Sequence, residues 1–138
     1  MIPRKINCAL DYKKLKEHFL NDISGNDRRL RFGGVVSDDY ILEYIDHPKL
    51  TDMWFVVEDK EKIVATCHVA YDKEHNVAEL GLTVSPDYRN QKIGQELFNR
   101  GITWARMRGA ETIFMHCLSE NMAVQHIARK GGDRKSVV

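Results

Sequence analysis

Few residues in this sequence are of the kinds that cross-link a chain, bind a metal or enter a membrane. Its 138 residues include three cysteines and three prolines. Cys8, Cys67 and Cys117 are widely spaced and form no Cys-x-x-Cys pair, so neither a disulfide framework nor a cysteine zinc site is predicted. The longest apolar runs, residues 54–57 and 63–65, are too short to cross a bilayer, and the N-terminus lacks the apolar stretch of a secretory signal. We therefore expect a cytoplasmic protein that binds neither a metal nor a membrane.

The chain also lacks an excess of charge of either sign. Lys and Arg number 21 against 20 Asp and Glu, which leaves a net charge of +1. Such a chain has no long-range field for binding nucleic acid, so any anion site must be local. Hydrophobic residues make up 43% of the sequence, enough for a core, and the length suits a single domain over residues 1–138.

Hydrophobic periodicity predicts an α+β domain built on a mixed sheet. Runs rich in β-branched and aromatic residues indicate strands over 6–10, 52–58, 62–71, 77–84 and 112–118. Apolar spacing of three to four residues indicates helices over 11–21 with Asp11 as N-cap, from Ser37 to Pro48, and over 93–108 and 121–130. The basic segment 24–32 is predicted to form a helical turn that ends at the two glycines after it. Short polar turns should join the three middle strands into an antiparallel meander, whereas a long helical crossover makes the last two strands parallel.

The most informative segment is a strand that passes through a tight turn, near residues 84–95, directly into a helix. The first amides of such a helix have no partner within it and point toward one spot at the positive end of the helix dipole. Gly94 would let a ligand approach the backbone closely. We therefore expect the turn to hold a diphosphate, with Arg89, Asn90, Gln91, Lys92, Ile93, Gly94 and Gln95 as contacts. The alternative is an ordinary connection that holds only water.

Two other phosphate-binding motifs fail at this turn. The pattern Gly-x-Gly-x-x-Gly is not found around it, and Gly-x-x-x-x-Gly-Lys-Ser/Thr does not occur. The spacing therefore favours neither a dinucleotide-binding site nor a nucleotide-triphosphatase site.

The segment Val84-Ser-Pro-Asp-Tyr-Arg-Asn-Gln-Lys-Ile-Gly94 resembles the acetyl-coenzyme A motif of the GNAT acyltransferase superfamily. The family pattern is Gln/Arg-x-x-Gly-x-Gly/Ala. Arg89 and Gly94 match it, whereas Lys92 stands where the first glycine is usual, which tightens the steric demand on the turn. The resemblance extends over roughly residues 4 to 132 and implies a GNAT-like fold with acetyl-CoA as cosubstrate.

The resemblance also implies contacts for the pantetheine arm of coenzyme A. In the family this arm pairs like an extra strand with the strand before the turn, which corresponds here to Leu82, Thr83 and Val84. Main-chain groups at these positions would also polarise the thioester carbonyl. Asn121 matches an asparagine that contacts the arm, although asparagine at a helix start is also an ordinary N-cap.

Two residues are candidates for proton transfer. An alkyl ammonium has a pKa of about 10.4, so an acceptor amine must lose a proton before it attacks a thioester. Glu79 lies on the same strand and is similar in position to a glutamate that many family members use through a water; the alternative is a solvated strand glutamate. His116, on the next strand, is a second candidate acid or base, or a structural histidine.

Two departures from the family pattern bear on activity. The general-acid tyrosine that is usual in the last helix is replaced by Ala128. After residue 132 too little sequence remains for the family's C-terminal strand hairpin. The strand over 112–118 would then be an exposed edge, and we expect it to pair with a second copy in a homodimer.

The leading interpretation is an acetyl-CoA-dependent N-acetyltransferase that acts on a primary amine of a small molecule or on a protein lysine. The alternative is a catalytically silent CoA-binding or interaction module with a truncated GNAT fold. A metal site formed by Cys67, His68, His116 and Cys117 is disfavoured, because neighbouring strand residues point to opposite faces. Basic residues at 28, 29, 31, 129, 130, 134 and 135 would steer an acidic acceptor or the 3′-phosphate of coenzyme A, or else are solvated surface charges.

Overall fold

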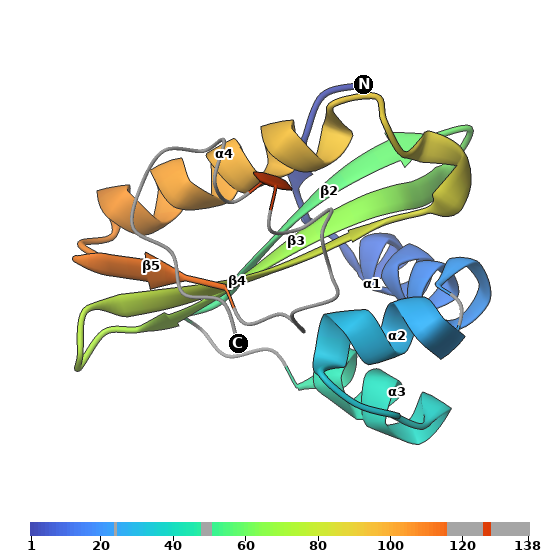
Figure 1. Cartoon of the computed structure of the whole chain (residues 1–138), viewed down its shortest axis with the longest axis horizontal. Coiled ribbons are helices and arrows are strands. Elements are labelled where there is room, and N and C mark those ends of the chain that lie inside the picture. Colours follow the sequence, from blue (N-terminus) through green and yellow to red (C-terminus); the bar gives the residue numbers. More distant parts are fainter. Residues whose placement is uncertain (24, 48–50, 116–125, 128–138) are drawn as a thin grey trace.

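The computed structural model describes residues 1–23, 25–47, 51–115, 126 and 127, and in this part a mixed sheet has helices on both faces (Figure 1). The strands are β1 (Arg4–Lys5), β2 (Met53–Asp59), β3 (Lys62–Asp72), β4 (Val77–Val84) and β5 (Thr112–Phe114). The helices are α1 (Ala9–Glu17), α2 (Gly25–Phe32), α3 (Asp38–Asp46) and α4 (Ile93–Met107). A π-helical turn, η1 (His18–Asp22), follows α1, and a 3-10 turn, η2 (Pro86–Tyr88), follows β4.

The order of the strands confirms the predicted α+β fold. They lie in the order β1-β2-β3-β4-β5, with antiparallel pairing from β1 to β4 and parallel pairing between β4 and β5. Lys60 and Glu61 both have positive φ, at 52° and 66°, which is the geometry of a tight two-residue hairpin turn between β2 and β3. The parallel pair follows from the crossover through α4.

The helices divide the hydrophobic core into two layers. Helix α4 covers one face of the sheet, and the N-terminal helices α1 to α3 cover the other (Figure 1). The layer under α4 includes Phe55, Leu80, Leu97 and Phe98, and the layer under the N-terminal helices includes Leu15, Phe19, Ile41, Ile45 and Trp54. The sheet therefore has no solvated face over most of its width, which explains why its middle strands are apolar on both sides.

Strand β4 carries a different kind of side chain on each face. Ala78, Leu80 and Leu82 are buried on the α4 side, while Glu79, Gly81 and Thr83 alternate with them. Helix α4 packs closely on this strand because Gly101 has no side chain: a Cβ there would lie 2.9 Å from Leu80 Cδ2. This close contact fixes the start of α4 beside the end of β4.

Two predictions for the N-terminal segment are wrong. Residues 6–10 are not a strand, since β1 is Arg4–Lys5 and α1 already begins at Ala9. Asp11 is not the N-cap; Cys8 holds that position, and Asp11 lies buried in the first turn of α1. The Asp11 carboxylate accepts two hydrogen bonds of 2.8 Å from the Arg4 guanidinium, which lowers the pKa of Asp11 to about 2. The pairing with Arg4, which lies outside the helix on β1, rather than capping of α1, accounts for the position of Asp11.

The remaining elements match their predictions to within a few residues. The Ser37 hydroxyl caps α3 by accepting a hydrogen bond from the Tyr40 amide at 3.1 Å. The predicted helix over 11–21 is divided into α1 and η1, and the predicted strand over 112–118 is described as far as residue 115, with β5 ending at Phe114. Residues 116–125 and 128–138, and with them most of the predicted helix over 121–130 and the C-terminal segment, lie outside the described residues.

A buried polar cluster joins η1 to the sheet. His18 is 1% exposed; its Nε2 lies 2.8 Å from Thr83 Oγ1, and its Nδ1 lies 3.2 Å from Ser85 Oγ. Thr83 Oγ1 is also hydrogen-bonded to Thr66 on β3, at 2.5 Å. Burial lowers the pKa of His18 to about 4, so the imidazole is neutral at physiological pH and can both donate and accept in this cluster.

We expect His18 to make stability depend on pH. Its pKa is about 4 in the folded chain against 6.5 ordinarily, so between these values the unfolded chain binds more protons. The free energy of unfolding should be at its full value above pH 6.5 and fall by up to about 3 kcal/mol as the pH drops to 4. Urea titrations of the wild type and of His18→Asn across this range measure the difference.

The exposed His47 provides the matched control, because His47→Gln should keep the wild-type slope. Equal slopes for the wild type and for His18→Asn would contradict the expectation.

Candidate functional site

The turn between β4 and α4 has the backbone geometry of a cradle for an anion. After η2, Asn90 and Lys92 adopt left-handed φ values of 63° and 64°, and α4 begins at Ile93. The Glu96 amide is the first to donate back into the helix, to the Lys92 carbonyl at 3.1 Å. The amides of residues 93 to 95 therefore have no intrahelical acceptor and lie at the positive end of the dipole of α4.

A cavity of about 490 Å³ opens beside this turn. Its wall is formed by the end of β4, the turn, the first turn of α4, part of α2, Ile23 after η1, and residues 126 and 127. It brings together most of the predicted cofactor contacts: Leu82, Thr83, Val84, Arg89, Asn90, Lys92, Ile93, Gly94 and Gln95. Gln91 is not part of the wall; its Nε2 donates to the Asp87 carbonyl at 3.4 Å. Asn121 and His116 lie outside the described residues.

Gly94 keeps the cavity open at the start of α4. A Cβ at this position would lie 2.8 Å from Ile127 Cδ1 and 3.7 Å from Val84 Cγ2. A side chain there would clash with Ile127, so the close packing at the start of α4 requires glycine.

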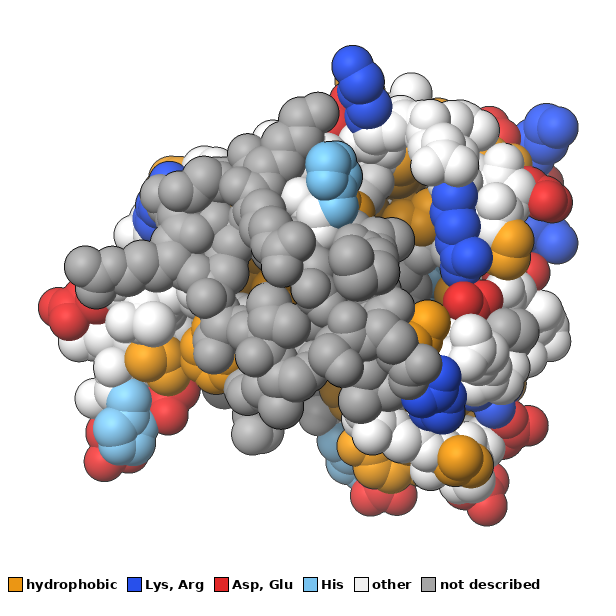
Figure 2. Space-filling model, in the orientation of Figure 1, with side chains coloured by type: hydrophobic (Ala, Val, Ile, Leu, Met, Phe, Trp, Pro, Cys, Tyr) orange, Lys and Arg blue, Asp and Glu red, His pale blue; other side chains and the backbone are white. Residues whose placement is uncertain are grey.

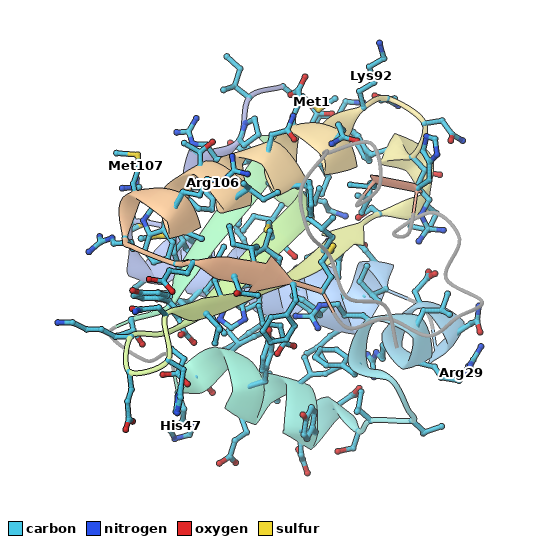
Figure 3. All side chains as sticks on the ribbon, turned by 60° about the vertical axis from the view of Figure 1, so that its left-hand side comes forward. Met1, Arg29, His47, Lys92, Arg106 and Met107 are labelled. Atoms are coloured by element: carbon cyan, nitrogen blue, oxygen red, sulfur yellow. The ribbon has the colours of Figure 1, made fainter. Side chains whose placement is uncertain are left out.

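Lys92 stands where the family pattern has a glycine. The structure shows why glycine would fit better, because this position has a left-handed backbone conformation. The left-handed conformation is strained for residues with a Cβ, by roughly 1–2 kcal/mol. The Lys92 side chain is exposed and extends away from the body of the protein (Figure 3). The backbone of the turn, rather than the Lys92 ammonium, therefore faces the cavity in this structure.

Arg89 ties the turn to α2. Its Nη2 forms an ion pair of 3.1 Å with Asp27 Oδ1, and its Nε donates to the Val84 carbonyl at 3.2 Å. Both Arg89 and Asp27 line the cavity. Sequence reasoning missed Asp27, because no local pattern places α2 next to the turn.

A second polar cluster lies at the α2 end of the cavity. Arg31, which lines the cavity, donates from Nη2 to the Tyr44 hydroxyl at 2.7 Å. The Tyr44 hydroxyl lies 2.6 Å from His68 Nδ1, and His68 Nε2 lies 3.2 Å from Asp52 Oδ2. Burial raises the pKa of Tyr44 and lowers the pKa of His68, so both side chains favour the neutral state. From the sequence alone, Arg31 was named only as one of the basic residues that would steer an acidic acceptor or the 3′-phosphate of coenzyme A.

Glu79 lies on β4 away from the turn. It is exposed, pairs with Ala70 on β3 and Phe114 on β5, and points to the opposite face of the strand from Leu80. It is two residues beyond Gly81, on the same face of the strand as Gly81 and Thr83. Glu79 is not among the described residues that line the cavity.

Tyr88 packs beneath the turn. Its hydroxyl donates to Asp59 Oδ2 at 2.7 Å, and this hydrogen bond raises the pKa of Tyr88. The side chain lines the cavity and packs against the core layer under α4.

The neighbours Cys67 and His68 lie on opposite faces of β3, as the alternation of a strand requires. Cys67 is buried under α4, which raises its pKa to about 12, while His68 contacts Tyr44 on the other face. Within the described ranges, no group of three or more His, Cys, Asp and Glu side chains is arranged to hold a metal ion. No helix in the same ranges is long and apolar enough to cross a membrane.

Comparison with known proteins assigns the fold to a family. The model of the acetyltransferase (GNAT) family matches residues 21–132. The GNAT domain of S. lividans PAT is similar with a TM-score of 0.77 and 16% identity, covering 94% of this chain and 79% of that chain. Ribosomal-protein-alanine N-acetyltransferase from Brucella melitensis is similar with a TM-score of 0.75 and 17% identity, covering 96% and 83% of the two chains.

A third similar structure was solved with a ligand. It is yncA from Salmonella typhimurium with its cofactor acetyl-CoA, with a TM-score of 0.67 and 20% identity, covering 96% of this chain and 78% of that chain. The sequence matches no curated protein. At these identities the solved structures show the fold, and the family match covers more than half of the sequence. The chain belongs to the acetyltransferase (GNAT) family.

Proposed function

We propose that this protein transfers an acetyl group from acetyl-CoA to a primary amine. The observation that carries the proposal is the cavity beside the β4–α4 turn, which joins unpaired helix amides to the end of a strand. The solved relative that contains acetyl-CoA supports the choice of donor. The acceptor is an amine of a small molecule or of a protein; the relatives include a ribosomal-protein-alanine N-acetyltransferase.

The diphosphate of the donor would bind at the turn. Backbone amides of Ile93, Gly94 and Gln95 would each donate to a phosphate oxygen, and Arg89 would add a charged donor. Asn90 and Lys92 contribute backbone to the same wall. The cradle therefore binds its anion chiefly through main-chain groups.

The extended pantetheine arm would pair with the end of β4. Among the described residues, β5 pairs with β4 only at residues 77–79, so the main chain of residues 80–84 has no strand partner on that side. Leu82, Thr83 and Val84 also line the cavity. Their main-chain groups can hold the arm and, where an N–H faces the thioester, stabilise negative charge on its oxygen.

The transfer itself needs an amine nucleophile and a base. The neutral amine nitrogen forms a bond to the acetyl carbon, and the carbon–sulfur bond then breaks to release the coenzyme A thiolate. Glu79 would accept the proton that the ammonium gives up, through water, because it lies on β4 on the face that Gly81 and Thr83 share. A thiolate with a pKa near 8.5 leaves without obligatory protonation, so the alanine at position 128 is compatible with turnover.

One observation favours the alternative, a catalytically silent CoA-binding module. Glu79 does not line the cavity within the described part of the chain, so the chain would then keep the cradle without a base in place. Binding of acetyl-CoA without release of free thiol distinguishes this function from transfer.

We expect calorimetry to detect binding of acetyl-CoA, and a thiol-release assay with a panel of amines to detect turnover. Arg89→Ala should weaken binding about tenfold, equivalent to about 1.4 kcal/mol, because it removes one charged donor. Arg106→Ala, in the exposed last turn of α4, is the control and should bind like the wild type. Absence of binding at millimolar acetyl-CoA would overturn the proposed function.

Replacing the base should affect chemistry and not binding. Glu79→Gln is expected to lower kcat about 100-fold, within the usual range for a general base, and to leave the affinity for acetyl-CoA unchanged. Glu74→Gln, in the exposed turn between β3 and β4, should have no effect. An unchanged kcat in Glu79→Gln would remove Glu79 from the mechanism and leave the donor site intact.

Replacing Lys92 should separate backbone strain from charge. Lys92→Gly is expected to raise the free energy of unfolding by about 1 kcal/mol, because glycine adopts the left-handed conformation without strain. Affinity for acetyl-CoA should change less than about threefold, the expected limit for an exposed charge. Asn90→Gly is the control: urea titrations should show a smaller increase in its free energy of unfolding, because asparagine tolerates the left-handed conformation. A tenfold loss of affinity in Lys92→Gly would instead assign the ammonium to the phosphates.

A further inference from the structure

The α2 end of the cavity contains a cationic side chain that the proposed binding of acetyl-CoA does not use. Arg31 lines the cavity, and its guanidinium carbon lies 4.8 Å from the centre of the Phe32 ring and 5.7 Å from that of Tyr44. Its Nε is buried, and no hydrogen-bond acceptor for it is present in the described part of the protein. A buried cationic N–H without a partner is unfavourable, and a ligand oxygen would remove that cost.

The guanidinium is held in one orientation. Nη2 donates to the Tyr44 hydroxyl, which in turn contacts His68 Nδ1, and His68 is oriented by Asp52 and by packing on Trp54 at 4.4 Å between ring centres. Tyr44 and His68 favour the neutral state, so this chain positions Arg31 without cancelling its charge. No ion pair of Arg31 with a carboxylate is present among the residues that the structure describes.

Arg31 lies directly on the strand that would present the thioester. A Cβ on Gly81 would be 2.1 Å from Arg31 Nη2 and 2.2 Å from Cζ, so only glycine leaves room for the guanidinium. Gly81 is three residues from Val84, about 10 Å along β4 at the usual rise. It also lies between Thr83 and Glu79 on one face of the strand, and thus between the cavity and the proposed base.

Each end of the cavity wall carries an arginine, but the two arginines have different surroundings. At the turn, the backbone amides and Arg89 would bind the diphosphate, and Asp27 is paired with Arg89. At the α2 end, Arg31 offers a fixed planar fork in which Nε and a neighbouring Nη donate side by side. That fork fits a carboxylate in a bidentate manner.

We propose that Arg31 binds a carboxylate of the acceptor, so that the preferred acceptors are small amines that carry a carboxylate, such as free amino acids. This inference rests on the proposed acetyl transfer and names the class of acceptor for that site. Holding the carboxylate at Gly81 places an amine a few bonds away toward residues 82–84, where the thioester would lie. Arg31 is thus a specificity residue, and Tyr44, His68 and Asp52 are positioning residues that act through it.

The test uses triplets of acceptors that differ only in the carboxylate: L-lysine, L-lysine amide and cadaverine, and L-phenylalanine, its amide and phenethylamine. With wild-type protein and acetyl-CoA, thiol release should show kcat/KM at least 30-fold higher for the carboxylate member of at least one triplet. Arg31→Gln should lower kcat/KM for that member about 100-fold and change it less than threefold for the amide. Arg31→Lys, which keeps the charge without the fork, should give an intermediate loss.

Two further variants separate recognition from folding. Gly81→Ala should displace the guanidinium and reduce the carboxylate preference although Arg31 is still present. Arg28→Gln is the matched control: Arg28 lies on the same helix and also has a buried Nε without a hydrogen-bond partner in the described residues, but it pairs with Asp38 and does not line the cavity. The preference of Arg28→Gln for the carboxylate member of a triplet should match that of the wild type. A loss in Arg31→Gln that is equal for all members of a triplet would overturn the inference.

Binding measurements keep the two proposals distinguishable. Calorimetric titration of each triplet into protein saturated with coenzyme A should show the carboxylate member binding at least tenfold more tightly than its amide, and Arg31→Gln should abolish that difference. If acetyl-CoA does not bind, the proposed function fails, and the same titrations into the free protein still test Arg31. Turnover of amines and amides as fast as amino acids, or no binding by any carboxylate member, would overturn the inference and leave acetyl transfer untouched.

Discussion

The packing of α4 against β4 is the contact on which the rest of the site depends. Because Gly101 lets the helix backbone approach Leu80 closely, the first turn of α4 is held at the end of the same strand. Helix amides without an intrahelical acceptor and the part of β4 that β5 does not pair with in the described residues therefore lie next to each other, and the cavity opens beside both. A shift of the helix along the strand would separate the two kinds of donor and remove the basis for binding a long, phosphorylated, extended ligand.

The opposite face of the same strand supplies the polar part of the site. Thr83 and Gly81 face the N-terminal helices, and each receives a side chain from them: His18 on Thr83 and Arg31 on Gly81. In both cases a polar side chain from the first third of the chain lies against a strand some fifty to sixty-five residues away in the sequence, and Asp27 likewise contacts Arg89 in the distant turn. On the face seen in Figure 2, acidic and basic side chains are interspersed around the part that is not described.

Local chemistry made the sheet and the turn predictable from sequence. Alternation along residues 77–84, the apolar stripe from Ile93 and the glycine at position 94 each reflect a short-range rule, and the structure follows all three. The left-handed conformation of Lys92 was not predicted as such: the family pattern indicated only that a residue other than glycine would fit this position poorly. Asp11 was wrongly predicted as an N-cap because the capping rule considers only hydrogen bonds within the helix, whereas the partner of Asp11 is Arg4, which lies outside it. The Arg31, Tyr44 and His68 cluster gave no local signal, because its members come from two helices and a strand that only the tertiary fold brings together.

The ion pair between Asp27 and Arg89 offsets the charge of the arginine at the turn. An incoming phosphate that takes Nη2 of Arg89 exchanges one anionic partner for another instead of meeting a bare cation. Because Asp27 already offsets part of the charge, the gain expected from this arginine is limited to about tenfold, and the backbone amides of residues 93 to 95 would contribute most of the remaining binding. Release of the Asp27 carboxylate would also break this contact between α2 and the turn. Binding at the turn would then be coupled to α2, the helix that carries Arg31 at the other end of the cavity.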